Sequence, residues 1–258
     1  MKNILFLLLV FPSFISIAQK LPDNTDPSVS KTEGMIVYER VSFWPKIINR
    51  LSYLSKEEKD RVKMTWGAND EGWKQNFNLY FNAKESLYTY GEDNVEETNG
   101  YSWRKEELIL HRNFETDKKT DIMDMLGKTY IVEDALNTPQ WKIMNQLKDI
   151  NGYICMKAVT EDTVKKQKIE AWFAQDIPVQ VGPERYFGLP GAILELDINE
   201  GDVVITAKKI EFKQVEKELK LPKLKGKKIK DADHDKLVAE HILNSIKSYR
   251  NPYWALRY

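Results

Sequence analysis

The stretch Val181-Gly182-Pro183-Glu184-Arg185-Tyr186-Phe187-Gly188-Leu189-Pro190-Gly191-Ala192-Ile193-Leu194-Glu195 decides the fold, because glycines and prolines crowd there between two runs with the pattern of strands. Within Leu189–Ala192, proline presets φ at the second turn position and Gly191 suits the positive φ of the third, which predicts a type II turn. The aromatic and aliphatic side chains around this turn favour burial. We therefore expect Val181–Gly191, the glycine–proline corner, to fold inward and join two strands.

Alternating apolar and polar residues predict strands on both sides of the corner. The expected strands are Tyr153–Thr160 and Lys168–Ala174 before it, and Ala192–Ile198 and Val203–Phe212 after it. Asn151-Gly152 supplies a strong turn signal ahead of the first of them. Short strands joined by turns predict an antiparallel meander.

The first half of the chain shows the same period. Gly34 begins an alternating run, and residues 76–82 and 86–90 form an expected hairpin around Asn82-Ala83-Lys84. Gly91–Gly100 is acidic and unpatterned, which favours an exposed loop. Further short strands are expected at Trp103–His111, Asp117–Met123, Thr129–Glu133 and, as an edge strand, Pro139–Ile143.

Helical spacing appears in two places. Apolar residues recur from Ile47 to Leu54, and Ser55 with Glu58 forms a capping box for a helix that Gly67 would end. The alternative assigns Val62–Trp66 to a strand.

Asp231–Tyr249 has the pattern of an amphipathic helix, with Asp231 or Asp233 as its cap. Its expected apolar stripe consists of Leu237, Val238, Ile242, Ile246 and Tyr249. The predicted fold class is mainly β (α+β): a curved antiparallel meander sheet or half-barrel with helices packed against it.

The N-terminus has the pattern of a secretory signal peptide. Lys2 precedes an apolar run, and Ser16-Ile17-Ala18 offers small residues where a signal peptidase cleaves, so we expect residues 1–18 to be removed. Residues 19–33 are polar and predicted to be a disordered leader, and residues 34–258 to be a single β-rich domain. No later stretch is apolar enough to cross a membrane. We expect a periplasmic or outer-membrane-associated protein.

Composition narrows the possible partners. Lys plus Arg and Asp plus Glu are each 39, and this balance argues against nucleic acid. The single cysteine excludes an internal disulfide, so a packed core must stabilise the fold.

A family resemblance lies in the corner. Gly188-Leu189-Pro190-Gly191-Ala192-Ile193 resembles Gly-Leu-Pro-Gly-Leu-Ile, the signature of the GLPGLI family of Bacteroidetes, with Ala192 in place of the usual leucine. Segments that resemble the family in the same order are Ile150–Ala158, Ala171–Phe173, Ile177–Val179 and Gly182-Pro183.

This resemblance implies an exported, mostly β protein of unestablished biochemical role. It also implies a gene neighbourhood with TonB-dependent outer-membrane receptors, and a sheet similar in kind to the half-barrels of periplasmic lipid carriers. It brings no agreed catalytic residues.

The corner is the candidate contact for a partner or ligand, through exposed backbone N–H groups and Tyr186. Its candidate residues are Gly182, Pro183, Tyr186, Phe187, Gly188, Leu189, Pro190 and Gly191. The alternative, which we favour, is a structural corner that shapes the fold, because turn chemistry alone accounts for each residue.

Other chemistry-bearing residues give weaker indications. His234 and His241 lie near one face of the predicted helix, and Asp235 or His111 would complete a metal site, but His-x6-His is not a recognised ligand spacing. Cys155 has no local histidine signature and is expected to be buried and inert. Since hydrolase, phosphate-loop and zinc motifs are absent from the sequence, we predict no catalytic residue, metal or cofactor.

Two further features leave alternatives open. Lys217–Lys230 suits either an anionic surface or, as we favour, a solvated connector. Aromatic residues would line an apolar pocket if the sheet curls, or fill an ordinary core closed by the helices; they include Trp44, Trp66, Phe77, Tyr80 and Trp172.

The sequence thus predicts an exported binding or interaction protein that acts with an outer-membrane, TonB-dependent transport or assembly system. The first alternative is a carrier of an apolar ligand, such as a lipid or peptide, in the concave face of the sheet. A hydrolase with an unrecognised site is the second alternative.

Overall fold

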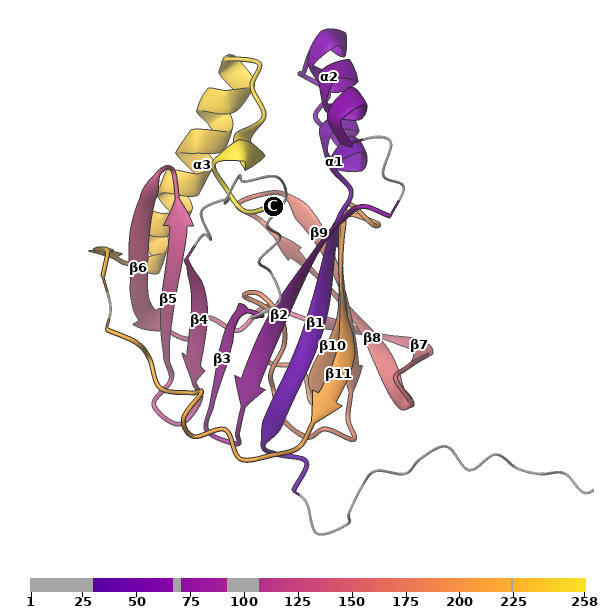
Figure 1. Ribbon diagram of the computed structural model, residues 1–258, viewed down its shortest axis with the longest axis vertical. Helices are drawn as coiled ribbons and strands as arrows, with labels where there is room; N and C mark the ends of the chain where they lie inside the picture. The colour runs from indigo at the N-terminus through magenta and orange to yellow at the C-terminus, as the bar shows by residue number, and fades with distance from the viewer. Residues whose placement is uncertain (1–29, 67–70, 92–106, 224) are drawn as a thin grey trace, which may run out of the picture.

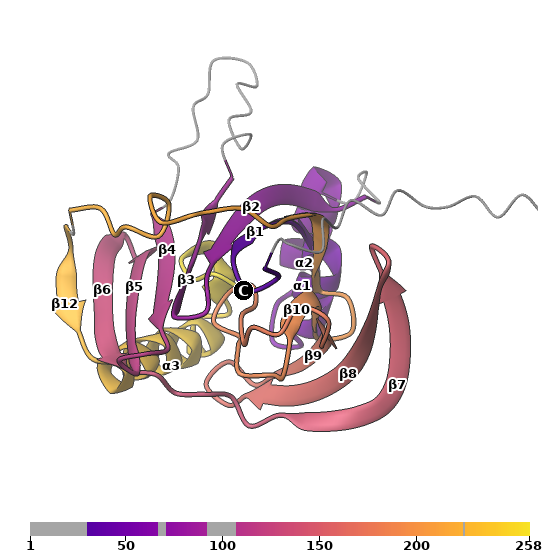
Figure 2. The same cartoon turned by 90° about the horizontal axis from the view of Figure 1, so that it is seen from below.

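Twelve strands form one open, curled sheet in the computed structural model, which describes residues 30–66, 71–91, 107–223 and 225–258 (Figure 1). Seen from below, the sheet curves around an interior that its two edge strands leave open (Figure 2). The expected mainly β, curled antiparallel architecture is confirmed. The predicted signal peptide, residues 19–29 of the predicted leader and most of the expected loop at residues 91–100 lie outside the described residues.

The sheet order is β12-β6-β5-β4-β3-β2-β1-β11-β10-β9-β8-β7. Neighbouring strands are antiparallel except β12 and β6, which are parallel. The strands are β1 (Gly34–Ser42), β2 (Trp73–Phe81), β3 (Glu85–Tyr90), β4 (Leu108–Asn113), β5 (Lys118–Met125), β6 (Lys128–Ala135), β7 (Lys142–Ile150), β8 (Tyr153–Asp162), β9 (Gln167–Ala174), β10 (Ala192–Ile198), β11 (Val203–Glu211) and β12 (Lys227–Ile229).

The core fills the concave side of the sheet, because alternate residues of each strand point inward. In β1, buried and half-buried residues alternate without interruption, as the sequence predicts. Tyr38 from this strand lies edge-on to Tyr88 of β3, and its hydroxyl donates to the carbonyl of Ile193 at 2.5 Å. Phe77 of β2 stacks on Tyr88 with ring centroids 5.1 Å apart.

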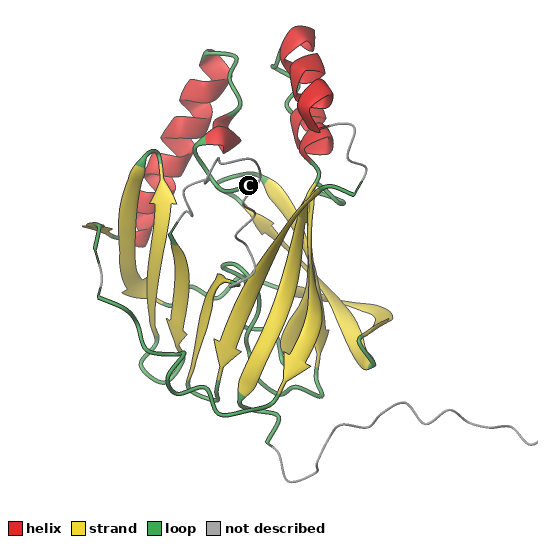
Figure 3. Ribbon diagram, viewed as in Figure 1, coloured by secondary structure: helices red, strands yellow, loops and turns green. Residues whose placement is uncertain are grey.

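The helices rise from one rim of the sheet (Figure 3). They are α1 (Trp44–Arg50), α2 (Lys56–Trp66), α3 (Asp231–Lys247) and a 3-10 turn, η1 (Pro252–Trp254). The predicted cap of α2 is confirmed, since the Ser55 hydroxyl accepts from the Glu58 N–H at 3.2 Å, and the alternative strand at Val62–Trp66 is wrong. No helix among the described residues has the length and apolar character needed to span a membrane.

The apolar stripe predicted for α3 is partly wrong. Val238 is buried, but Ile246 and Tyr249 are exposed, while His234 and Ser245 are buried instead. The reason is geometric: the C-terminal half of α3 projects past the sheet (Figure 1), so it has no strand to pack against. The predicted aspartate cap is also wrong, because Lys230 occupies the cap position and the Asp134 carboxylate of β6 accepts from the first helical N–H instead.

The glycine–proline corner folds inward and joins two strands, as expected. Its residues Val181 and Leu189 are buried, and Val181 accepts a backbone hydrogen bond from Ile193 at 2.9 Å. The type II turn is wrong: the N–H of Gly191 bonds to the carbonyl of Leu189, and that of Ala192 turns away to Ile177. This is a three-residue γ-turn centred on the proline.

Two segments differ from the expected connector and tail. Lys217–Lys230 is more than a solvated connector, since Leu219 packs on the convex side of the sheet and β12 pairs with β6. The C-terminal segment, Asn251–Tyr258, returns from α3 into the mouth of the curled sheet (Figure 1). Its Leu256 and Tyr258 belong to the main core cluster.

Candidate functional site

A cavity of about 450 Å³ lies within the curl of the sheet. Strands β4 and β5, the β8–β9 turn, the glycine–proline corner, α3 and the C-terminal segment all contribute to its walls. Its five cationic side chains are Arg112, Lys119, Lys165, Arg185 and Arg257. Apolar side chains such as Leu110, Met123 and Leu256 line the rest of its surface, so the cavity combines charged and apolar walls. Of the two alternatives left open by the sequence, an apolar pocket and an ordinary filled core, the structure shows a pocket, but one with charges in its walls.

The corner contributes four consecutive cavity residues, Glu184 to Phe187. Of the eight predicted contact residues, only Tyr186 and Phe187 line this cavity. The others shape the corner: Gly182, Pro183, Leu189 and Gly191 are buried, Gly188 is half-buried and Pro190 is exposed. Sequence reasoning passed over the charged pair Glu184-Arg185 at the centre of the same stretch.

Glu184 is the centre of one ion cluster. Its carboxylate accepts from Arg257 Nε at 2.8 Å and Nη2 at 2.6 Å, and it lies 3.4 Å from Arg40 Nε. Burial alone would raise the pKa of Glu184, but the charge and hydrogen bonds of Arg257, assisted by Arg40, hold it below its ordinary value. The carboxylate therefore stays ionised and fixes Arg257 against the aromatic rings of Phe77 and Tyr90.

A second ion cluster surrounds the fully buried Asp121 of β5. Arg112 hydrogen-bonds to it, and Arg185 and Lys119 lie 3.5 and 3.9 Å from its carboxylate. Burial raises the pKa of Asp121, yet the three cations outweigh burial and lower it. Asp231 at the start of α3 extends the cluster, since it binds Lys119 Nζ at 2.5 Å and Arg185 Nη2 at 2.7 Å. The cluster ties β5, the corner and α3 together.

His234 is the histidine that reaches the cavity, with Nδ1 3.0 Å from the carboxylate of Asp235. Among the described residues, Asp231, His234 and Asp235 are the group whose ligand atoms lie close enough for a metal ion. Lys119 and Arg185 already neutralise Asp231, which makes this group an ion-pair network rather than a metal cage. No hydroxyl or thiol within the described ranges hydrogen-bonds to His234, so it has no nucleophile to activate.

The two predicted partners of His234 lie elsewhere. His241 Nε2 is 3.2 Å from the carbonyl of Pro252 in η1, so it serves as a packed, hydrogen-bonded core histidine. His111 lies on the convex side of the sheet, because it alternates with the cavity residues Leu110 and Arg112 along β4. These positions rule out a site that combines His234 with His241 or His111.

Lys165 stands apart from the other cations of the cavity. Asp162 Oδ1 accepts the N–H groups of Val164 and Lys165 at 2.9 Å, and this turn directs the Lys165 side chain inward. Its Nζ donates to the carbonyl of Arg257 at 2.9 Å. Burial lowers the pKa of Lys165 to about 8; the charge of Asp162 opposes this shift, and the guanidinium groups of Arg185 and Arg257 reinforce it.

The remaining candidates do not reach the cavity. Cys155 is buried, and burial raises the pKa of its thiol to about 12, which agrees with an inert thiol. Of the predicted pocket aromatics, Phe77 fills the core, Trp44 stacks on Trp254, and Tyr80 packs on the convex side. The side chain of Trp66 lies outside the described residues.

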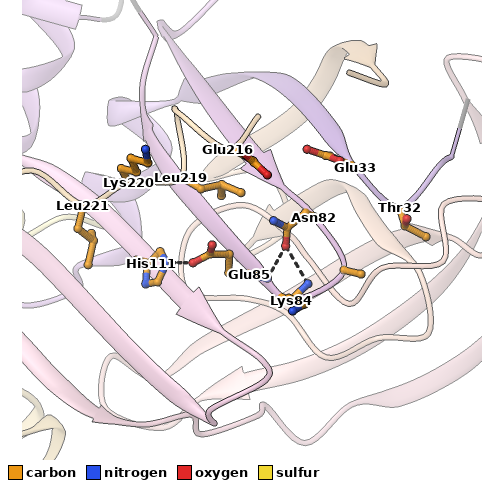
Figure 4. Close-up of a pocket in the computed structure, with 11 residues that line it drawn as sticks. Thr32, Glu33, Asn82, Lys84, Glu85, His111, Glu216, Leu219, Lys220 and Leu221 are labelled. Carbon is orange, nitrogen blue, oxygen red and sulfur yellow. Dashed lines mark hydrogen bonds and ion pairs between the residues drawn. The ribbon is translucent and has the colours of Figure 1, made fainter. Parts of the chain in front are cut away.

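A second, open pocket of about 740 Å³ lies on the convex side, between the β2–β3 turn and the connector that follows β11 (Figure 4). His111 Nε2 is 2.7 Å from the carboxylate of Glu85 at its floor. Asn82 Oδ1 accepts the backbone N–H groups of Lys84 and Glu85, as Figure 4 shows. These contacts organise the turn, and the pocket lacks the enclosed, convergent charges of the cavity.

Residues 160–195 match the family described as "Protein of unknown function (Porph_ging)". The matched segment runs from the end of β8 through the Lys165 turn, β9 and the corner into β10, and therefore covers one wall of the cavity. No curated protein matches the chain.

Two solved structures share the fold. PNGF-II in its P21 crystal form has a TM-score of 0.52 at 13% identity, and in its C2 form a TM-score of 0.53 at 15% identity. Each comparison covers 80% of this chain, but only 33% and 32% of the PNGF-II chains. The chain therefore spans about a third of the length of PNGF-II, and at this identity the likeness concerns the fold.

Proposed function

We propose that this chain is an exported envelope protein that binds a small, polar, charge-bearing ligand in the cavity of its curled sheet. The observation that carries the proposal is a cavity of about 450 Å³ into which ionised side chains from six separate parts of the fold converge. Ligand sites are typically concave spaces of about 300–1,000 Å³ with a few convergent polar groups.

The charged lining favours a polar ligand over an apolar one. Burying ions costs free energy unless each has a partner, and replacing such pairs with apolar side chains is often neutral or stabilising. A carrier of a lipid chain gains nothing from Arg112, Lys119, Arg185 and Arg257 along its walls. A ligand that carries its own charges and hydrogen-bonding groups can form ion pairs and hydrogen bonds with these preorganised side chains.

Export and envelope location rest on the sequence. The apolar run with Ser16-Ile17-Ala18, and the resemblance of Gly188–Ile193 to the GLPGLI signature, support an exported member of that family. A TonB-dependent receptor or another outer-membrane component is the partner that the resemblance favours. Cell fractionation and N-terminal sequencing test this part: a mature chain that begins at Gln19 in the periplasm or envelope is expected, and an unprocessed cytoplasmic chain would refute it.

Native mass spectrometry of protein purified gently from envelopes tests the ligand. We expect a bound polar small molecule that is released on denaturation and that Arg185→Gln loses, because this change disrupts the cavity wall. Lys84→Gln, in the convex pocket, is the matched control and should retain the molecule. The proposal fails if envelope-purified protein carries no small molecule and amino acids or short peptides do not shift its thermal unfolding.

A further inference from the structure

The cations of the cavity differ in one respect, which is whether a carboxylate neutralises them. Arg112 pairs with Asp121, Lys119 and Arg185 pair with Asp231, and Arg257 pairs with Glu184. Lys165 has no carboxylate within 4.0 Å in the part of the chain that the structure describes, and its Nζ donates to the Arg257 carbonyl instead. Asp162 and Glu184 act on its charge only from beyond this distance, so Lys165 is the cavity cation that, among the described residues, is held without a direct ion pair.

Gln167, two residues further along the same hairpin, carries, within the described ranges, a buried donor without a partner at the wall of the same cavity. Its side chain lines the cavity and the residue is only 2% exposed. Its amide Nε2 has no hydrogen-bond partner among the described residues. A buried amide donor without an acceptor costs about 1–3 kcal/mol, so an acceptor oxygen that reaches this donor would stabilise the folded state. Lys165 and Gln167 line the same cavity.

We propose that Lys165 and Gln167 form a subsite for a carboxylate group of the ligand. The inference rests on the proposed function, in that it takes the cavity to be a ligand site. The ammonium supplies one positive charge and the amide supplies a neutral donor, which together match a monoanion with two acceptor oxygens.

A phosphate dianion suits the subsite less well. The second negative charge would need another free cation, and the guanidinium groups nearby are already committed to Glu184 and Asp231. Two classes of ligand carry such a carboxylate, a short peptide at its C-terminus and an aliphatic acid, and they share this chemistry.

NMR of the full mature chain with ¹³C-dimethylated lysines tests the subsite, with the Lys165 signal assigned by its loss in Lys165→Met. The probes are acetyl-Ala-Ala with a free carboxylate, its C-terminal amide, decanoate and inorganic phosphate. We expect a free carboxylate to shift the Lys165 signal saturably and to raise the pH at which it titrates. The amide should leave it unchanged. Preference for the dipeptide or for decanoate identifies the source.

The affinity for a carboxylate is measured in two variants of the subsite and in one control variant. Gln167→Leu should weaken carboxylate binding about 10-fold or more, and Lys165→Met should do the same or abolish it, by the usual strength of hydrogen bonds to charged groups. Lys166→Met changes the exposed neighbour in the same turn and should bind as the wild type does. Thermal unfolding confirms that each variant is folded.

The outcomes separate the two proposals. Equal binding of the free acid and the amide, unchanged binding in both subsite variants, or tighter binding of phosphate would overturn the carboxylate subsite while leaving a ligand-binding cavity. No effect of any probe on Lys165, together with no co-purifying ligand, would overturn both.

Discussion

Glu184 holds a strained backbone in place. Its φ of +56° lies in the left-handed region, which residues other than glycine adopt rarely. The two hydrogen bonds from Arg257 to its carboxylate hold Glu184 in this conformation. We predict that Glu184→Ala lowers the free energy of unfolding by about 3–5 kcal/mol, because it leaves Arg257 buried without a counter-ion. Urea denaturation measures this loss.

The double variant Glu184→Ala with Arg257→Met removes both charges and should recover part of the stability. If the single variant loses less than about 1 kcal/mol, the pair is not the anchor of the corner.

Lys165 is expected to destabilise the fold at neutral pH. The pKa of Lys165 in the folded state, about 8, is below its ordinary value of 10.5. The folded state therefore binds this proton more weakly than the unfolded state does, and protonation of Lys165 favours unfolding. The penalty is complete below pH 8 and is relieved as the pH rises from 8 to 10.5. The shift sets an upper limit of about 3 kcal/mol, and the partial exposure of the side chain reduces it.

We therefore predict that Lys165→Met raises the free energy of unfolding at pH 7 by about 1–2 kcal/mol, and that this gain shrinks through pH 8 to 10.5. Denaturation at several pH values measures it, with Lys166→Met as an unaffected control. A Lys165→Met variant less stable than the wild type at pH 7 would refute the expected penalty.

At the scale of elements, the corner depends on a close approach of two backbones. A Cβ on Gly191, whose φ is +154°, would lie 2.2 Å from the carbonyl oxygen of Ala174. Gly191→Ala should lower the free energy of unfolding by about 2 kcal/mol or more, since the clash involves backbone that cannot move aside. Gly152→Ala is the control: its φ is also positive, at +81°, but its Cβ would meet open space, so only about 1 kcal/mol is expected. Equal losses would show that backbone conformation alone explains the glycine.

The buried face of α3, which differs in part from the predicted apolar stripe, gives another test. Val238 is buried against the core, whereas Ile246 is 39% exposed beyond the sheet. Val238→Ala should lower the unfolding free energy by about 2 kcal/mol, and Ile246→Ala should change it by no more than about 0.5 kcal/mol. A larger loss at Ile246 would restore the stripe that the sequence predicts.

The sequence predicts the elements whose pattern is local. Alternation in β1 and β9 and the capping serine of α2 are written in neighbouring residues, and the structure follows them. The three-residue β12 has no such pattern, because a short edge strand rich in lysine has no buried face to mark it. The exposed end of α3 keeps a helical period, but only the extent of the sheet decides which residues find a partner.

At the scale of the whole molecule, the cavity is assembled from parts that are distant in sequence. Glu184 and Arg257 are 73 residues apart, and Lys119 and Asp231 meet only because β5 and α3 are neighbours in space. No spacing rule in the sequence connects such residues. The sequence therefore indicated a contact site at the corner but did not indicate a role for its charged pair, Glu184-Arg185. The missed signal was the placement of Glu184-Arg185 within an otherwise apolar stretch, since ionised residues there need buried partners.

The open sheet has two edge strands, and they differ in how well they are protected against pairing with another molecule. One edge is the short, lysine-bearing β12, and the other is the nine-residue β7, on whose hairpin Ile143, Leu147 and Ile154 are exposed. The register of β7 shifts between Met144 and Leu147, and such an interruption of the ladder hinders pairing between sheet edges.

We predict that Leu147→Lys lowers concentration-dependent association, measured by light scattering, and changes the free energy of unfolding by less than about 0.5 kcal/mol. Leu243→Lys removes a similarly exposed leucine from α3, away from the edge, and should leave association unchanged. If both variants reduce association equally, general surface hydrophobicity, and not the open strand edge, governs how these molecules meet.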